Sequence, residues 1–223
     1  MKMIFTEFNL SSFEDFHDKE WFSKTYALVK GTGLESVTED FVAHWYGNAR
    51  AFIFPWLLID GVYDGINAVV PLPSSPQDLW NDYLKLEGFH AALWKLAENT
   101  YCSIYYAYEN LIVNLLIKIL GSKVRVTDRD FNSKLVKIYG DQLASKLWTS
   151  SFVAMSREVR NCIVHNGGKA SKKLLDMSLR PQIDEDNIMI SASDARYLYT
   201  QLKPLVSVLL INSLTKIREN RMS

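Results

Sequence analysis

The segment from Arg157 to Gly168 carries the residue types best suited to chemistry on a phosphate. It reads Arg157-Glu158-Val159-Arg160-Asn161-Cys162-Ile163-Val164-His165-Asn166-Gly167-Gly168. An arginine guanidinium is a permanent cation that binds phosphate through two parallel hydrogen bonds. An imidazole gives and takes a proton near neutral pH. Arg160, Asn161 and His165 on one surface could therefore cleave RNA without a metal, with the RNA's own 2′-hydroxyl as the nucleophile.

The spacing predicts that this segment ends an amphipathic helix that stops at the double glycine. At about 100° per residue, Asn161 lies about 100° and His165 about 140° from Arg160 around the helix. The apolar residues gather on the opposite side; they are Phe152, Met155, Val159, Cys162 and Ile163. Val153 and Val164 fall instead beside Arg160, and we expect both to be exposed on the monomer and buried against a second subunit. The same residues also fit an ordinary surface helix, in which the arginine and the histidine have no chemical role.

The charge of the chain is balanced overall but uneven along the sequence. The 25 basic and 25 acidic residues cancel, so the protein as a whole is not drawn to nucleic acid by bulk charge. Residues 157–180 and residues 118–137 each hold six basic and two acidic side chains. Lys169, Lys172 and Lys173 follow the motif directly and are the candidate substrate-binding cations. Basic runs of this length are also typical of solvated helix faces.

The cysteines and histidines indicate no metal site. Two cysteines, Cys102 and Cys162, and four scattered histidines give no metal-ligand spacing, so we expect neither a metal nor another cofactor. The apolar runs are too short to span a bilayer, and the N-terminal residues lack the long apolar stretch of a signal peptide. These patterns predict a cytoplasmic protein that does not associate with a membrane.

Helical patterns dominate the chain and predict an all-α fold, an antiparallel helical bundle with a small β-hairpin before the C-terminal helix. The expected helices cover 12–30, 39–54, a stretch that starts at 75–78 and runs to 99, 100–120, a short stretch opened by 127–130, 141–165 and 191–217, with a long connection over 61–76 and the hairpin within 180–190. Pro55 should end the second helix and Pro204 should kink the last. We expect a helical N-terminal extension of unknown role over 1–77 and a second domain over 78–223.

Residues 101–120 are apolar almost all round, which predicts a helix in the middle of the bundle. Glu109 lies among those apolar residues and should point into packed surroundings. A buried carboxylate needs a partner or a shifted pKa, and the nearest candidate cations are Arg160 and Arg157. Such a pair would either orient a functional site or only fix the packing of two helices.

On these residues the chain resembles the HEPN superfamily (higher eukaryotes and prokaryotes nucleotide-binding), over roughly residues 78–218. The resemblance rests on Arg160-Asn161-x-x-x-His165 near the end of a long helix. It also rests on the preceding buried helix with Glu109, and on the hairpin and closing helix that follow. Residues 1–77 match no pattern of this family.

The resemblance implies a helical bundle that forms a homodimer in which the two motifs face each other. Many members are metal-independent endoribonucleases of toxin–antitoxin and other defence systems, whereas others are non-catalytic scaffolds or RNA binders. It implies that RNA is the substrate and an antitoxin protein a further partner. His165 would be the general base or acid, Arg160 would bind the phosphate, and Asn161 would fix the phosphate or the imidazole. Glu109 and Arg157 would support them.

Overall fold

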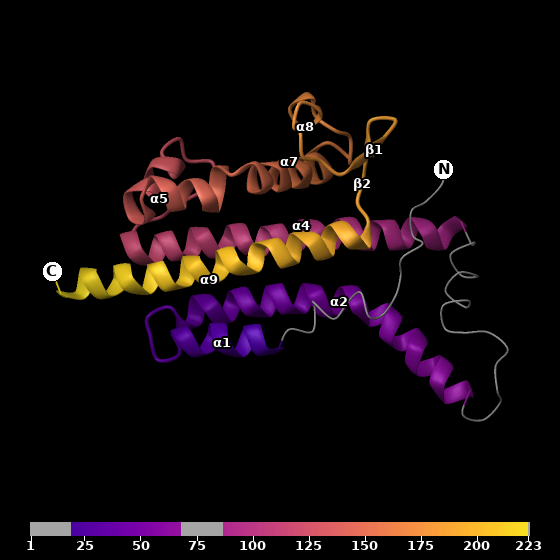
Figure 1. The fold of residues 1–223 in the computed structure, drawn as a ribbon, viewed down its shortest axis with the longest axis horizontal. Coiled ribbons are helices and arrows are strands. Elements are labelled where there is room, and N and C mark those ends of the chain that lie inside the picture. Colours follow the sequence, from indigo (N-terminus) through magenta and orange to yellow (C-terminus); the bar gives the residue numbers. More distant parts are fainter. Residues whose placement is uncertain (1–18, 68–86, 223) are drawn as a thin grey trace.

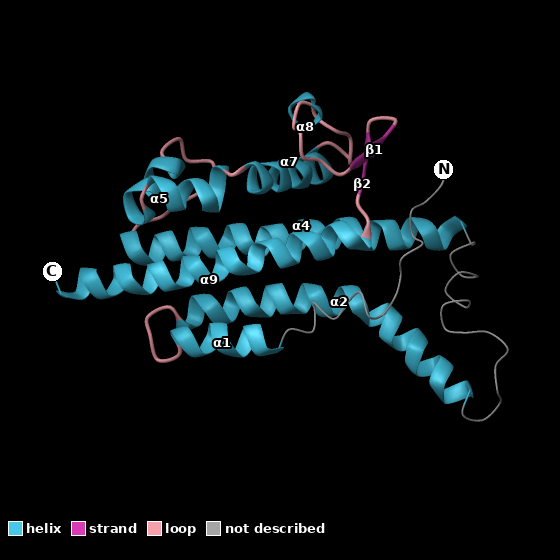
Figure 2. Ribbon diagram, in the orientation of Figure 1, coloured by secondary structure: helices cyan, strands magenta, loops and turns pink. Residues whose placement is uncertain are grey.

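The computed structural model describes residues 19–67 and 87–222, and within these ranges the chain is almost entirely helical (Figures 1 and 2). In chain order the elements are α1 (Lys19–Val29), α2 (Glu35–Asn67), α4 (Glu87–Leu120), α5 (Phe131–Tyr139), α6 (Asp141–Ala144), the π-helical turn η2 (Ser145–Thr149), α7 (Ser151–His165), α8 (Lys172–Leu175), β1 (Gln182–Asp184), β2 (Asn187–Met189) and α9 (Ala192–Met222). The predicted helical bundle with a small hairpin before the C-terminal helix is confirmed.

Helix α4 is the centre of the molecule. It packs against α2 and α9 on one side and against α7 on the other, while α1 lies on α2 and α9. Figure 1 shows that α7 runs antiparallel to α4, so the end of α7 lies beside the first half of α4. Because α4 is covered on both sides, its residues from Ile104 to Leu116 are largely buried, as its all-round apolar sequence requires.

Two helices are longer than the sequence patterns predict. Pro55 does not end α2, which continues to Asn67, so the connection expected over 61–76 begins later, and its remainder lies outside the described residues. Figure 1 shows that α2 bends along its length, and a proline can bend a helix without ending it when packing supports both halves. The break expected between 99 and 100 is absent, because both residues lie inside the continuous helix α4.

The helix predicted over 141–165 is divided, and this correction matters for the site. The chain forms α6 and η2, and Ser150 then takes an extended conformation with ψ of 148° before α7 begins. The hydroxyls of Thr149 and Ser150 donate to the carbonyls of Ser145 and Lys146. Hydroxyl side chains that bond to nearby carbonyls compete with regular helix geometry. The run Thr149-Ser150-Ser151 is therefore the sequence signal of this break.

The hairpin forms backbone hydrogen bonds with the segment that follows α7. Its strands pair with Ile183 opposite Ile188, and the two-residue turn has positive φ angles at Glu185 (46°) and Asp186 (76°), as tight hairpins favour. The Ile188 amide donates to the Gly168 carbonyl at 2.8 Å, and the Ala170 amide donates to the Asp186 carbonyl at 2.7 Å. The backbone just beyond His165 is therefore fixed.

Helices α1 and α9 overlap the helices predicted at the two ends of the chain. The helix expected from residue 12 begins at Lys19 in the structure, and the residues before it lie outside the described part, as does the helix start expected at 75–78. Helix α9 continues through Pro204 and reaches Met222, beyond the expected end at 217. None of the helices in the described ranges combines the length and the hydropathy that a bilayer span needs.

Candidate functional site

A buried ion pair joins α4 to α7 at the centre of the candidate site. Arg160 Nη2 lies 2.5 Å from Glu109 Oε1, and the two side chains are 17% and 11% exposed. The predicted pairing of Glu109 with a motif arginine is confirmed. Burial raises the pKa of Glu109, while the charges of Arg160 and Arg157 and the hydrogen bond from Arg160 oppose the rise. The pair fixes the guanidinium at one place on the surface of α4.

The pair retains unused hydrogen-bonding capacity. Within the described residues, Glu109 Oε2, Arg160 Nε and the Tyr105 hydroxyl are buried and have no hydrogen-bond partner. The Arg160 guanidinium also lies 5.8 Å from the centre of the Tyr105 ring. Buried polar groups in folded proteins are nearly always satisfied. Unsatisfied groups at an ion pair beside a surface hollow are therefore a reason to expect that this place does more than join two helices.

Arg160 and His165 line one hollow that is open to solvent. The hollow has a volume of about 350 Å³ and is lined by Cys102, Ser103, Tyr106, Arg160, Val164 and His165. Most of its lining is apolar, and Tyr106 and Val164 are each 55% exposed. His165, the last residue of α7, is exposed. The cation and the imidazole of the motif thus reach the same surface.

Sequence reasoning did not assign to the site the three residues that α4 contributes to the hollow, Cys102, Ser103 and Tyr106, although a signal was present. At about 100° per residue, Cys102 and Tyr106 lie within about 60° of Glu109 around the helix. Because Glu109 was expected to contact the motif arginine, the residues in the preceding turns of the same face of α4 could have been expected to lie beside that arginine as well.

Asn161 and Arg157 do not reach the hollow. Asn161 is half-buried, and it is not among the lining residues. The Arg157 guanidinium lies 4.3 Å from the centre of the Trp148 ring, and its Nη1 donates to the Trp148 carbonyl at 3.3 Å. Arg157 therefore caps a carbonyl at the junction between η2 and α7. Its charge still acts on Glu109, as described above, so its supporting role is electrostatic and structural.

The three lysines that follow the motif lie in different surroundings. Lys173 Nζ lies 2.8 Å from Glu158 Oε2, and the Ser171 hydroxyl donates to Glu158 Oε1 at 2.6 Å. Burial alone would raise the pKa of Glu158, but these hydrogen bonds outweigh it and the pKa lies below its usual value. This contact holds α8 against α7. Lys169 and Lys172 are exposed and are the lysines of this group best placed to meet a ligand.

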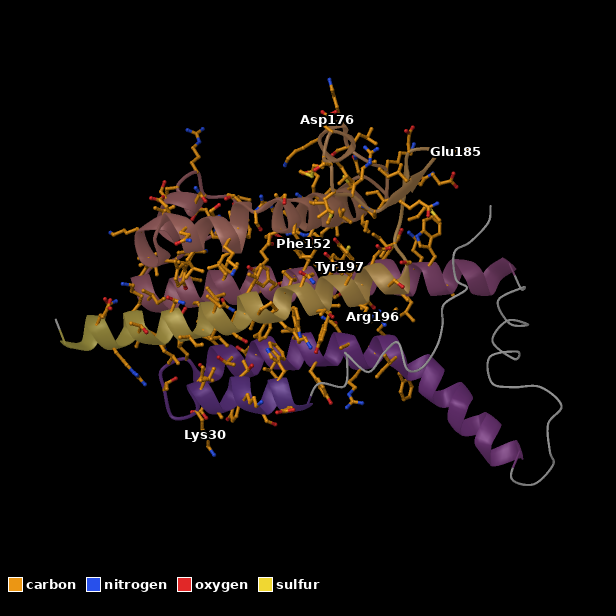
Figure 3. The ribbon with its side chains drawn as sticks, in the orientation of Figure 1. Lys30, Phe152, Asp176, Glu185, Arg196 and Tyr197 are labelled. Carbon is orange, nitrogen blue, oxygen red and sulfur yellow. The ribbon has the colours of Figure 1, made fainter. Side chains whose placement is uncertain are left out.

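The prediction that Val153 is exposed beside Arg160 is wrong. Val153 is fully buried within the monomer, whereas Val164 is 55% exposed. Next to Val153, half-buried Phe152 meets Tyr197 of α9 edge to face, with ring centres 5.6 Å apart (Figure 3). A helical wheel assigns one environment to a whole face, but along this face of α7 burial decreases from Val153 to Val164.

Neither metal-ligand geometry nor known relatives add to this description. Among residues 19–67 and 87–222, no three histidine, cysteine, aspartate or glutamate side chains are grouped so that they could hold a metal ion. Comparisons with protein-family models, with curated proteins and with solved structures found no match to this chain. The function must therefore be argued from the site itself.

Proposed function

We propose that this protein is a metal-independent endoribonuclease that cleaves RNA by 2′-hydroxyl transesterification, and that it acts as a toxin or defence effector. The observation that carries the proposal is the hollow that is lined both by Arg160, held by buried Glu109, and by the exposed His165. The toxin or defence role rests only on the resemblance to the HEPN superfamily.

The chemistry needs two proton transfers and one site for negative charge. His165 would take the proton from the 2′-hydroxyl, whose oxygen attacks the adjacent phosphorus, or would give a proton to the leaving 5′-oxygen. Arg160 would bind the non-bridging phosphate oxygens and stabilise the extra charge of the pentacoordinate transition state. The products would be a 2′,3′-cyclic phosphate and a 5′-hydroxyl. DNA would not react, because it lacks the 2′-hydroxyl.

The proposed active form is a homodimer that shares the site. One His165 cannot be base and acid in the same step, but two copies facing each other would supply both roles. Tyr106 and Val164 leave an apolar surface around the hollow, and a second copy would bury it. A two-fold axis would place the same face of each α7 opposite itself. The burial of Val153 narrows the proposed interface to the end of α7 and the adjoining turns of α4.

The second candidate is a non-catalytic dimerisation module, or one that binds RNA or a partner protein such as an antitoxin. The observation that favours it is the engagement of Arg160, whose side chain is only 17% exposed and is already paired with Glu109. A pair of this kind can serve packing alone. The two candidates share the surface around Tyr106 and Val164 and differ in whether His165 reacts.

Cleavage of mixed RNA by the purified protein in EDTA, compared with His165→Ala, separates the two candidates. We expect the wild type to cleave, because the nucleophile belongs to the substrate, and His165→Ala to be inactive. Cleavage that is lost in EDTA and restored by Mg²⁺ or Mn²⁺ would overturn the metal-independent mechanism. Equal cleavage by the two proteins would exclude His165 as the catalytic residue. Binding without cleavage would favour the module.

A further inference from the structure

A second buried carboxylate lies on α4 near the hollow, and it also holds a cation. The Glu98 side chain is 1% exposed, and its Oε2 lies 2.5 Å from the ammonium of Lys95, which is 60% exposed. Within the described residues, Glu98 Oε1 is buried and has no hydrogen-bond partner. Burial of a carboxylate is costly. Because Lys95 is exposed, its pairing with Glu98 does not by itself explain why the Glu98 carboxylate is buried.

The Lys95–Glu98 pair repeats the arrangement of Arg160 and Glu109. In each pair a buried glutamate of α4 holds one cation, and one carboxylate oxygen has no hydrogen-bond partner among the residues that the structure describes. At about 100° per residue, Lys95 and Glu109 lie within about 40° of each other around α4. Cys102 and Tyr106, which line the hollow, lie on the same face. Lys95 therefore lies on that face of α4, seven residues before Cys102, which is about 10 Å along the helix axis.

The pair also lies beside the turn that follows His165. A Cβ on Gly168 would lie 4.0 Å from Glu98 Oε1, and Lys169, the next residue, is exposed. Electrostatics at Cys102 agree with this placement. Burial and Glu98 raise the pKa of the Cys102 thiol to about 12, while Arg160 and Lys95 both act to lower it. Both cations are therefore within electrostatic reach of one side chain of the hollow.

We propose that Lys95 binds a backbone phosphate beyond the scissile one, so that the substrate is an RNA strand lying along α4 from Arg160 toward Lys95. The proposal rests on the proposed function for the scissile phosphate itself. An ammonium carries three donors, and Glu98 takes one, so a phosphate oxygen can take another. Glu98 positions Lys95 and does not touch the substrate. The site thus selects RNA with more than one phosphate.

The test compares two substrates that differ in whether they reach Lys95. A dinucleotide has only the scissile phosphate, whereas an octanucleotide also has its neighbours. Lys95→Gln should raise KM for the octanucleotide about 10-fold, as expected for one lost charge-assisted hydrogen bond, and leave kcat and all dinucleotide kinetics unchanged. Lys95→Arg should keep most of the octanucleotide affinity. Lys216→Gln is the control, because Lys216 pairs with Glu219 at the same i,i+3 spacing on α9 and should change nothing.

A binding measurement decides the inference even if no RNA is cleaved. Octanucleotide affinity is measured at several salt concentrations on the His165→Ala background, with and without Lys95→Gln. Loss of one phosphate contact to a single strand should reduce the slope of log K against log salt by about 0.7. An unchanged slope and affinity, or a dinucleotide impaired as much as the octanucleotide, would overturn the role of Lys95. Failure of the wild type to cleave, with the slope still reduced, would overturn only the proposed function.

Discussion

The contact around Trp45 is built from aromatic side chains, whereas the contact between α4 and α7 contains a buried ion pair. Where α1, α2 and α9 meet, Trp45 stacks on Tyr199 with ring centres 4.8 Å apart and also packs against Trp21 and Phe41. Between α4 and α7, the bundle instead encloses the ion pair of Glu109 and Arg160. Aromatic side chains stabilise a fold mainly through the large apolar area that they remove from water, whereas a buried charge is stabilised only by a well-placed partner.

The residues of the aromatic contact are therefore distinct from the residues that line the hollow. The aromatic contact can be weakened without touching the hollow, and the residues of the hollow can be changed without opening the aromatic core. The account therefore predicts that substitutions in the two regions alter different measured quantities. Glu109 and Arg160 are the exceptions, since their ion pair belongs to the fold and to the site.

The largest expected effect is on activity. His165→Ala and Arg160→Ala should each reduce RNA cleavage by roughly 10²–10⁴-fold, because one removes a proton-transfer group and the other a phosphate-binding cation. His165→Ala should leave the melting temperature almost unchanged, since His165 is exposed. Cleavage rates and thermal unfolding of the same preparations provide the measurement. Near-wild-type cleavage by either variant would show that the site lies elsewhere.

The matching effect in the aromatic region is on stability. Trp45 is 1% exposed, so Trp45→Ala should lower the free energy of unfolding by about 3–5 kcal/mol. The folded fraction should keep its specific activity. Trp45→Phe, which retains a ring, should cost less. Denaturant unfolding with cleavage assays checks both quantities, and a loss of specific activity in folded Trp45→Phe would show that the two regions are coupled.

Glu109→Ala should affect both quantities. Removal of the carboxylate leaves Arg160 buried without its partner, and this should destabilise the protein by about 3 kcal/mol, the lower end of the range for broken buried pairs. Activity should fall as well, because the guanidinium is no longer fixed. Double-mutant cycles with Arg160→Ala measure the coupling between the two. Purely additive losses would mean that the pair does not stabilise the contact between α4 and α7.

The smallest expected effect on the fold is that of Val164→Asp. Val164 is 55% exposed and lines the hollow, so the substitution should leave the monomer folded while it disrupts the proposed dimer and abolishes cleavage. Light scattering at micromolar concentration gives the oligomeric state. Leu28→Asp is the control, since Leu28 is an exposed apolar residue of α1 (43%). A wild-type monomer that cleaves RNA would contradict the shared site.

The sequence predicted the features of this protein that depend on local pattern. Helical periodicity and the polar turn before residue 188 indicated the bundle and the hairpin. A single acidic residue in an apolar stretch indicated that Glu109 would pair with Arg160 or Arg157, and the structure shows the pair with Arg160. The role of the site residues stays a prediction, because neither the structure nor the comparisons test it.

The features that depend on tertiary packing could not be predicted in this way. Pro55 and the pair 99–100 lie inside continuous helices, since local propensity is only a weak signal of where a helix ends. Val153 is buried and Val164 exposed although both lie on the same face of α7, and a helical wheel contains no information about how burial changes along the length of a helix. Lys95 and Glu98 were missed because an i,i+3 pair looks ordinary until its burial is known.

Cleavage of unmodified RNA and of the same RNA carrying 2′-O-methyl groups, both in EDTA, tests the central claim most directly. The account predicts that the wild type cleaves the unmodified strand to 2′,3′-cyclic phosphate ends and leaves the methylated strand intact, because methylation removes the attacking hydroxyl. His165→Ala should cleave neither. Cleavage of the methylated strand by the wild type, or a 3′-hydroxyl end created at the cleaved bond, would contradict transesterification at the Arg160–His165 hollow.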